Sequence, residues 1–215
     1  DEALAELGAA SQPPQKLVAI GPEGNQLEIG NETVMFRHEE KFHHPPGIAV
    51  TVSDTDDVAE KLEKIGKLHF EHMGKNIAVD TVAAVCESGD ADSFTETVSA
   101  LSTQLGYPMV LVGDSADVLV PAGKSVADDK PLLWERQGPS DALVEFAADN
   151  DLPIVVEGDL ETCDKTTQKA KDAGVEGIVL CPGDVSPAES LEFLTVSRRA
   201  ALRKTYRPLG YPALV

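Results

Sequence analysis

The chain has 215 residues, of which 42% are hydrophobic and 26% charged, so it is long enough to bury a sizeable core. Its 37 acidic and 18 basic residues give a formal net charge of −19, which repels nucleic acid and anionic lipid surfaces. No apolar run approaches the length of a membrane helix, and no signal peptide is visible. We expect neither nucleic acid nor membrane as a partner.

The first 45 residues precede the main repeating pattern. Residues 1–15 predict a short helix and a Pro/Gln linker. Three short extended pieces follow at 17–20, 26–29 and 33–36, separated by Gly-Asn dipeptides that favour turns. Apolar and polar residues alternate along the last two pieces, which indicates a hairpin with one buried face. We therefore assign residues 16–45 to a hairpin lead-in.

From residue 46 onward, short and nearly continuous apolar runs alternate with helical patterns. Runs of this kind are typical of strands buried on both faces of a parallel sheet. Helical patterns cover 58–65, 94–105, the region of 143–146, 160–173, and a long segment from the capping box at Ser186 to Lys204. The strand runs are GIAVTV from Gly47, IAVDTVAAVC from Ile77, PMVLV from Pro108, PLLWE from Pro131, PIVVE from Pro153, GIVLC from Gly177, and the final YPALV.

Seven strand signals with helices between them indicate an α/β protein, either a doubly wound sheet or a (β/α)8 TIM barrel. No Gly-rich phosphate-binding loop follows a strand, so we favour the barrel. Seven of eight strands are visible, and an incomplete barrel has open edges. We therefore expect that the barrel of residues 46–215 is truncated before its last strand.

Nearly every predicted strand ends in a carboxylate, and in a barrel such ends carry the chemistry. Any single one is readily explained as a helix N-cap. Together they form an acidic rim suited to amide-bearing or cationic ligands. The carboxylates are Asp54, Glu87, Asp114, Glu135, Glu157, Asp159 and Asp184, and we take Asp54, Glu135, Glu157 and Asp159 as candidate cofactor-binding residues.

The histidines and cysteines predict no metal site and no catalytic residue. His69 and His72 lie three apart, a spacing possible on one helical face, and HEEKFHH adds more imidazole, but neither matches a zinc signature. We expect Arg37, His38 and Glu39 to pair locally or with the barrel floor. The three cysteines, too few for a [4Fe–4S] cluster, are expected to be buried thiols in a reducing, cytoplasmic compartment; they are Cys86, Cys163 and Cys181.

Several longer stretches resemble a known family. ETVMFRHEEKFHHPPGIAV followed by Ser53 and Asp54, with KPLLWE, LPIVVEGDLE, AGVEGIVLCPG and RRAALRKTYRPLGYPALV, resembles the large (gamma) subunit of the corrinoid iron–sulfur protein. That subunit belongs to the acetyl-CoA decarbonylase/synthase complex. The likeness covers residues 17–215. Aspartate is usual in the family where Cys181 stands, and asparagine near His43 or His44, which weakens any ligand role for these residues.

The resemblance implies a methyl carrier in the reductive acetyl-CoA pathway. A full-length subunit would hold a [4Fe–4S] cluster on an N-terminal domain, to which residues 1–15 are the linker, and a corrinoid (cobalamin) on a C-terminal domain. The barrel would be a scaffold, non-catalytic by itself and without a cofactor. Implied partners are the small (delta) subunit, a methyltetrahydropterin methyltransferase and acetyl-CoA synthase. The alternative is an autonomous pterin-binding methyltransferase that uses the four rim carboxylates.

Overall fold

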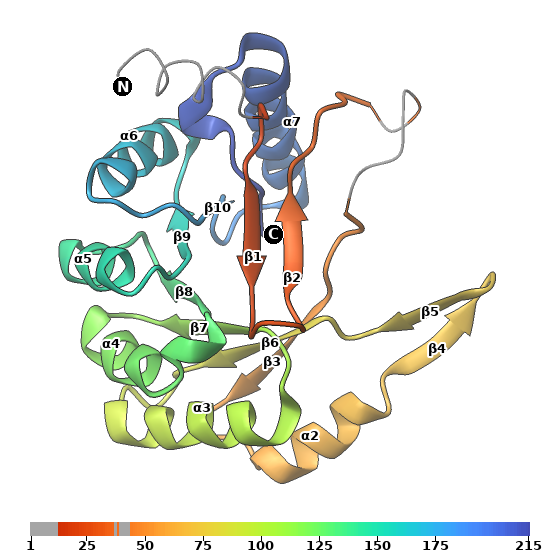
Figure 1. The fold of residues 1–215 in the computed structure, drawn as a ribbon, viewed down its shortest axis with the longest axis vertical. Helices are drawn as coiled ribbons and strands as arrows, with labels where there is room; N and C mark the ends of the chain where they lie inside the picture. Colours follow the sequence, from red (N-terminus) through yellow and green to blue (C-terminus); the bar gives the residue numbers. More distant parts are fainter. Residues whose placement is uncertain (1–12, 37, 39–43) are drawn as a thin grey trace.

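The computed structural model describes residues 13–36, 38 and 44–215. Its centre is a six-stranded parallel sheet in which chain neighbours pair, in the order β10-β9-β8-β7-β6-β3 (Figure 1). The strands are β3 (Ala49–Ser53), β6 (Thr81–Val85), β7 (Met109–Gly113), β8 (Leu132–Glu135), β9 (Ile154–Glu157) and β10 (Ile178–Cys181). The helices are α2 (Val58–Gly66), α3 (Ala91–Leu105), α4 (Ala116–Ser125), α5 (Asp141–Asp149), α6 (Leu160–Asp172) and α7 (Pro187–Lys204), with 3-10 turns η1 (Ala127–Asp129) and η2 (Arg207–Leu209).

The chain end supplies a seventh strand position beside β10. Leu180 forms a parallel bridge with Ala213, and its amide donates to the carbonyl of Pro212 at 2.8 Å. Strands that follow one another around a sheet, each with a helix outside it, are the arrangement of a TIM barrel. The predicted barrel, with seven strand positions, is therefore confirmed, although the last position is a single bridge.

Alternate side chains of each strand face two different hydrophobic clusters. One lies between the sheet and the helices and includes Phe94, Leu101, Leu119 and Leu143 from α3, α4 and α5. The other contains no helix residue and fills the barrel interior, since strand side chains alternate between faces. Its buried members are Val18, Ile20, Ala83, Val85, Val110, Val112, Leu132, Val155, Val179 and Cys181.

An antiparallel hairpin, β1 (Leu17–Ile20) paired with β2 (Leu27–Gly30), closes the N-terminal end of the barrel (Figure 1). Val18 and Ile20 are each 2% exposed and pack into the interior cluster. The amide of Gly21 donates to the carbonyl of Lys130 at 3.1 Å, just before β8 begins. The predicted N-terminal hairpin is thus confirmed, but it pairs the first two predicted extended pieces and not the last two, along which the alternation was seen. It leaves the other end of the barrel as the open one.

The third predicted extended piece is not a strand. Residues 33–36 form no ladder; instead Arg198 on α7 donates through Nε to the carbonyl of Met35 at 3.2 Å and through Nη2 to that of Val34. The expectations for the linker before residue 13, and those involving Arg37, Glu39 and His43, lie outside the described residues.

His69 and His72, whose spacing is possible on one helical face, do not lie on a helix. They begin and end strand β4 (His69–His72), which pairs with β5 (Lys75–Ala78) in a separate two-stranded sheet. The predicted strand from Ile77 is accordingly divided between β5 and β6. We call residues 68–78 the arm.

None of the helices in the described part of the chain combines the length and apolar character that crossing a bilayer requires.

Candidate functional site

The mouth of the barrel, where the parallel strands end, is the place where TIM barrels carry ligands. Strand register brings the predicted rim to one edge, because Ser53 lies opposite Val85, Gly113 opposite Glu135, and Cys181 opposite Glu157. The question at each carboxylate is whether its oxygens face a ligand or bind the protein itself.

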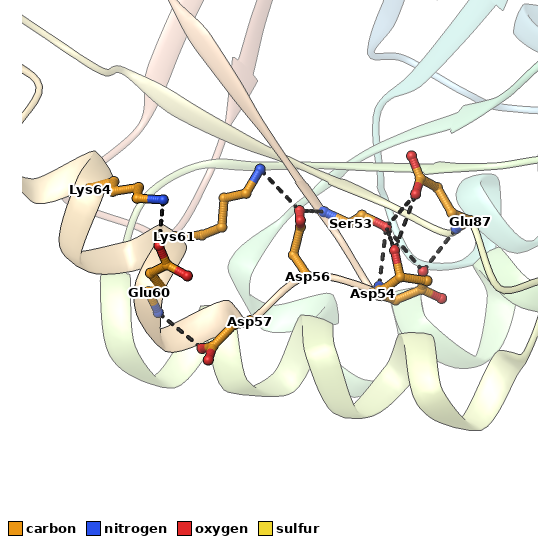
Figure 2. A network of polar contacts seen from close by, with 9 residues as sticks. Ser53, Asp54, Asp56, Asp57, Glu60, Lys61, Lys64 and Glu87 are labelled. Atoms are coloured by element: carbon orange, nitrogen blue, oxygen red, sulfur yellow. Dashed lines mark hydrogen bonds and ion pairs between the residues drawn. The ribbon is translucent and has the colours of Figure 1, made fainter.

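Asp54 holds two loops of the mouth together (Figure 2). Its Oδ1 accepts the amides of Glu87 at 2.9 Å and Ser88 at 3.2 Å, and its Oδ2 accepts the hydroxyl of Ser88. Burial raises the pKa of Asp54, but the hydrogen bonds from Ser88 and the backbone outweigh burial, so the pKa lies below its ordinary value. Asp54 is therefore a carboxylate that joins the end of β3 to the loop after β6.

The neighbouring polar groups extend this network rather than point to a ligand. The hydroxyl of Ser53, 8% exposed, donates to Glu87 Oε2 at 2.9 Å, and Thr55 donates to the same oxygen at 3.2 Å. Asp56 accepts the amide of Ser53 at 2.9 Å and pairs with Lys61 at 3.1 Å (Figure 2). The carboxylates and hydroxyls of this network therefore form hydrogen bonds with groups of the protein itself.

Glu135 is 7% exposed and caps two helices. Its Oε1 accepts the amide of Ala116 at the start of α4, at 3.2 Å, and its Oε2 accepts the amide of Ser140 at 2.7 Å, just before α5. Ser115, the N-cap residue of α4, makes no side-chain capping bond, so Glu135 takes over that role. Both oxygens thus serve the fold.

Asp159 is the N-cap of α6, where its Oδ1 accepts the amide of Thr162 at 2.8 Å. Hydrogen bonds from the side chain and then the backbone of Thr162 lower the pKa of Asp159. Its carboxylate is exposed at the helix start, outside the barrel interior.

Glu157 differs from the other three because, among the hydrogen bonds of the described residues, its carboxylate accepts a side-chain donor and no backbone amide. Its Oε2 accepts the indole N–H of Trp134 at 2.7 Å, and both residues are partly exposed. On the other side, a Cβ on Gly183 would lie 2.9 Å from Glu157 Oε1, so only glycine fits there without a shift. Trp134 packs on the interior cluster.

Trp134 was absent from our sequence-based candidates. The alternation of side chains along LLWE could have identified it. Leu132 faces the barrel interior, so Trp134, two residues later, faces the interior as well, and Glu135 faces the opposite side of the strand.

The thiols are not poised for chemistry. Cys86, Cys163 and Cys181 are buried, and burial raises the pKa of each, that of Cys163 to about 12. No group of three or more metal-ligating side chains occurs within the described part of the chain. His69 and His72 are exposed on the arm.

Comparison with known proteins identifies relatives over the whole barrel. The family described as CO dehydrogenase/acetyl-CoA synthase delta subunit matches residues 17–215. The corrinoid/iron-sulfur protein large subunit of Moorella thermoacetica is 32% identical over 219 residues, covering 100% of this chain and 49% of that protein. The acetyl-CoA decarbonylase/synthase complex subunit gamma of Methanopyrus kandleri is 31% identical over 225 residues, covering 100% and 48%. The chain spans about half the length of these curated relatives.

Solved structures that resemble the fold include dihydropteroate synthases. The enzyme from Thermus thermophilus aligns with a TM-score of 0.61 at 17% identity, covering 93% of this chain and 76% of that one. The Xanthomonas albilineans enzyme in complex with indole-2-carboxylic acid and 6-chloroguanine gives 0.60 at 15% identity, covering 92% and 76%. At such identities the likeness shows the fold alone.

Proposed function

Because the chain belongs to the CO dehydrogenase/acetyl-CoA synthase delta subunit family, we propose that it is the scaffold barrel of a corrinoid methyl-carrier subunit. The whole protein would pass a methyl group from a methyl-tetrahydropterin to acetyl-CoA synthase in the reductive acetyl-CoA pathway. Its corrinoid and [4Fe–4S] cluster would sit on domains before and after this barrel. The name of the Moorella relative, a corrinoid/iron-sulfur protein large subunit, supports this assignment.

One observation carries the scaffold role. Three of the four candidate rim carboxylates, Asp54, Glu135 and Asp159, accept backbone amides of the barrel's own loops and helices. Carboxylates used this way position the fold and leave few oxygens for a ligand. The four remain proposals as ligand-binding residues, with Glu157 the one whose surroundings suit it best.

The proposed partners are the small (delta) subunit, in a heterodimer, the methyltetrahydropterin methyltransferase, and acetyl-CoA synthase. All would meet this subunit in the cytoplasm. The barrel would hold the two cofactor domains at a fixed separation and present a docking face to the other proteins.

The test uses the full-length native protein. We expect about one cobalt and about four irons per chain, and methyl transfer from a methyl-tetrahydropterin in the presence of the methyltransferase. Glu157→Gln should leave the transfer rate within about twofold of the wild type, because a scaffold residue contacts no reacting atom. A native protein without cobalt and iron would contradict the carrier role.

A second function, autonomous pterin binding at the mouth, is favoured by the Trp134–Glu157 pair. An aromatic face beside a carboxylate suits a flat heterocycle that presents N–H donors. Titration calorimetry of the chain alone with methyl-tetrahydrofolate decides between the two functions. A Kd below about 10 μM, lost in Glu157→Gln, would favour the pterin enzyme over the scaffold.

A further inference from the structure

The carboxylates of this chain outnumber its cations and lie at its surface. The chain has 37 acidic and 18 basic residues, and only two of the acidic residues that the structure describes, Glu32 and Glu135, are buried. A single partner surface cannot cover the others, because every helix from α2 to α7 carries at least one exposed carboxylate (Figure 1). In chain order, one from each helix, these are Glu60, Asp92, Asp117, Asp141, Glu161 and Glu189.

Few of these carboxylates are neutralised by a cation. The described residues form eight ion pairs, and no side chain belongs to two of them. Isolated pairs at the surface contribute little to stability. Proteins adapted to heat typically carry networks of ion pairs and are rich in lysine as well as glutamate. An acidic excess without such networks indicates adaptation to salt and not to heat.

Some carboxylates lie close enough to repel one another. A small cleft of about 300 Å³ between α6 and α7 is lined by Asp159, Glu161, Glu189 and Glu192. Asp159 and Glu189 cap the two helices, and Glu161 pairs with Lys165 at 2.6 Å. Glu192 is exposed and makes no hydrogen bond or ion pair with any residue that the structure describes. Its charge therefore adds to the repulsion in the cleft and stabilises nothing there.

Salt sets the range of this repulsion. The Debye length is about 8 Å at 0.15 M salt and about 3 Å at 1 M. Residues three or four apart on a helix, such as Glu189 and Glu192, have Cβ atoms about 5–6 Å apart. Their carboxylates therefore repel at 0.15 M and are largely screened at 1 M. Salt also weakens the eight attractive pairs, but the net charge of −19 makes repulsion the larger effect.

We propose that this barrel is adapted to concentrated salt and needs molar monovalent cations to reach its full stability. The cations screen the surface as a diffuse atmosphere and occupy no fixed site. At low ionic strength, repulsion among the carboxylates destabilises the compact state. The inference concerns the folded chain alone, so it stands or falls separately from the proposed function.

The experiment measures the temperature at which the barrel unfolds within the full-length protein, in KCl from about 0.1 M to about 2 M. Hydrogen exchange of peptides from β6 to β9 reports the barrel and not other domains. We expect the melting temperature of the wild type to rise by at least about 10 °C over this range. Sucrose, which is excluded from protein surfaces but screens no charge, should raise it by less than half as much.

Two charge reversals test whether crowded carboxylates cause the salt dependence. Glu192→Lys places a cation three residues after Glu189, so it should raise the melting temperature by about 2 °C or more at 0.1 M KCl and by less than about 1 °C at 2 M. Glu71→Lys is the matched control. It makes the same change in net charge on the arm, whose single acidic residue is Glu71, and should shift the melting temperature by less than about 1 °C at either concentration.

Three results would overturn the inference. The first is a wild type whose melting temperature rises by less than about 3 °C in KCl, or by as much in sucrose as in KCl. The second is a gain in Glu192→Lys that persists at 2 M KCl, since screening should remove it. The third is an equal gain in Glu71→Lys, which would mean that the crowding of carboxylates has no part in the effect.

Discussion

Glutamine at position 135 should destabilise the barrel measurably, although Glu135→Gln preserves the shape of the side chain. The carboxylate is 7% exposed and accepts two amides, one at the start of α4 and one just before α5. Glutamine offers one oxygen and one NH2 group, so one buried amide would face a donor instead of an acceptor. Leaving a buried donor unsatisfied costs about 1–3 kcal/mol.

For a chain of this size, each 1 kcal/mol lowers the melting temperature by about 2–4 °C. A cost of about 2 kcal/mol therefore predicts a shift of about 4–8 °C. Thermal unfolding followed by circular dichroism measures the shift, and urea unfolding gives the free energy independently. Glu145→Gln, on the exposed face of α5, is the control and should change stability by less than about 0.5 kcal/mol.

The sign of the effect distinguishes two roles for Glu135. A carboxylate that serves a ligand usually lowers the stability of the free protein. For such a residue, Glu135→Gln would leave the free energy of unfolding unchanged or increase it. A variant that melts within about 1 °C of the wild type, or above it, would refute the capping role.

Burial raises the pKa of Asp54, but the hydrogen bonds to its carboxylate outweigh burial and hold the pKa below the ordinary value. Ionised Asp54 therefore stabilises the folded protein above about pH 4, and this stabilisation is lost as the pH falls through the lower pKa of the folded state. Asp54→Asn should therefore lower the free energy of unfolding at pH 7, with the difference from wild type shrinking below about pH 4; a constant difference would count against this. Because burial raises the pKa of Cys163 to about 12 and also that of the other two thiols, Ellman's reagent at pH 8 should react slowly with all three until urea is added. Gly183→Ala should push Glu157 off the indole and shift the fluorescence of Trp134, the single tryptophan; an unchanged spectrum would mean that the loop gives way instead.

Most barrel strands were predictable because they are short runs buried on both sides, as in β6 and β7, and most helices were predictable because they end at clear stop signals. The capping box at Ser186 and the stop at Gly106 both appear as expected. The resemblance to the large subunit of the corrinoid iron–sulfur protein is confirmed by its relatives. Helix α4 was missed because Pro121 and Gly123 interrupt its pattern, yet tertiary packing of Leu119 overrides this weak propensity.

The arm and the rim were harder for different reasons. Met73-Gly74 is not a usual turn dipeptide, so the hairpin carried no recognisable signal. The predicted strand ends identified residues that lie at one edge of the sheet. The role of each carboxylate, however, depends on hydrogen-bond partners that are far away in the sequence. Glu135 reaches Ala116 nineteen residues away, a contact no local pattern contains.

The β1–β2 hairpin has a consequence for biosynthesis. It leaves the ribosome before the barrel does, yet Val18 and Ile20 belong to the same buried cluster as Cys181, and the amide of Lys16 donates to the carbonyl of Gly210. The hairpin therefore waits for the last strand positions of the barrel. Until the segment around Gly210 has emerged, the interior stays unsealed, so synthesis passes through an aggregation-prone interval that chaperones would have to cover.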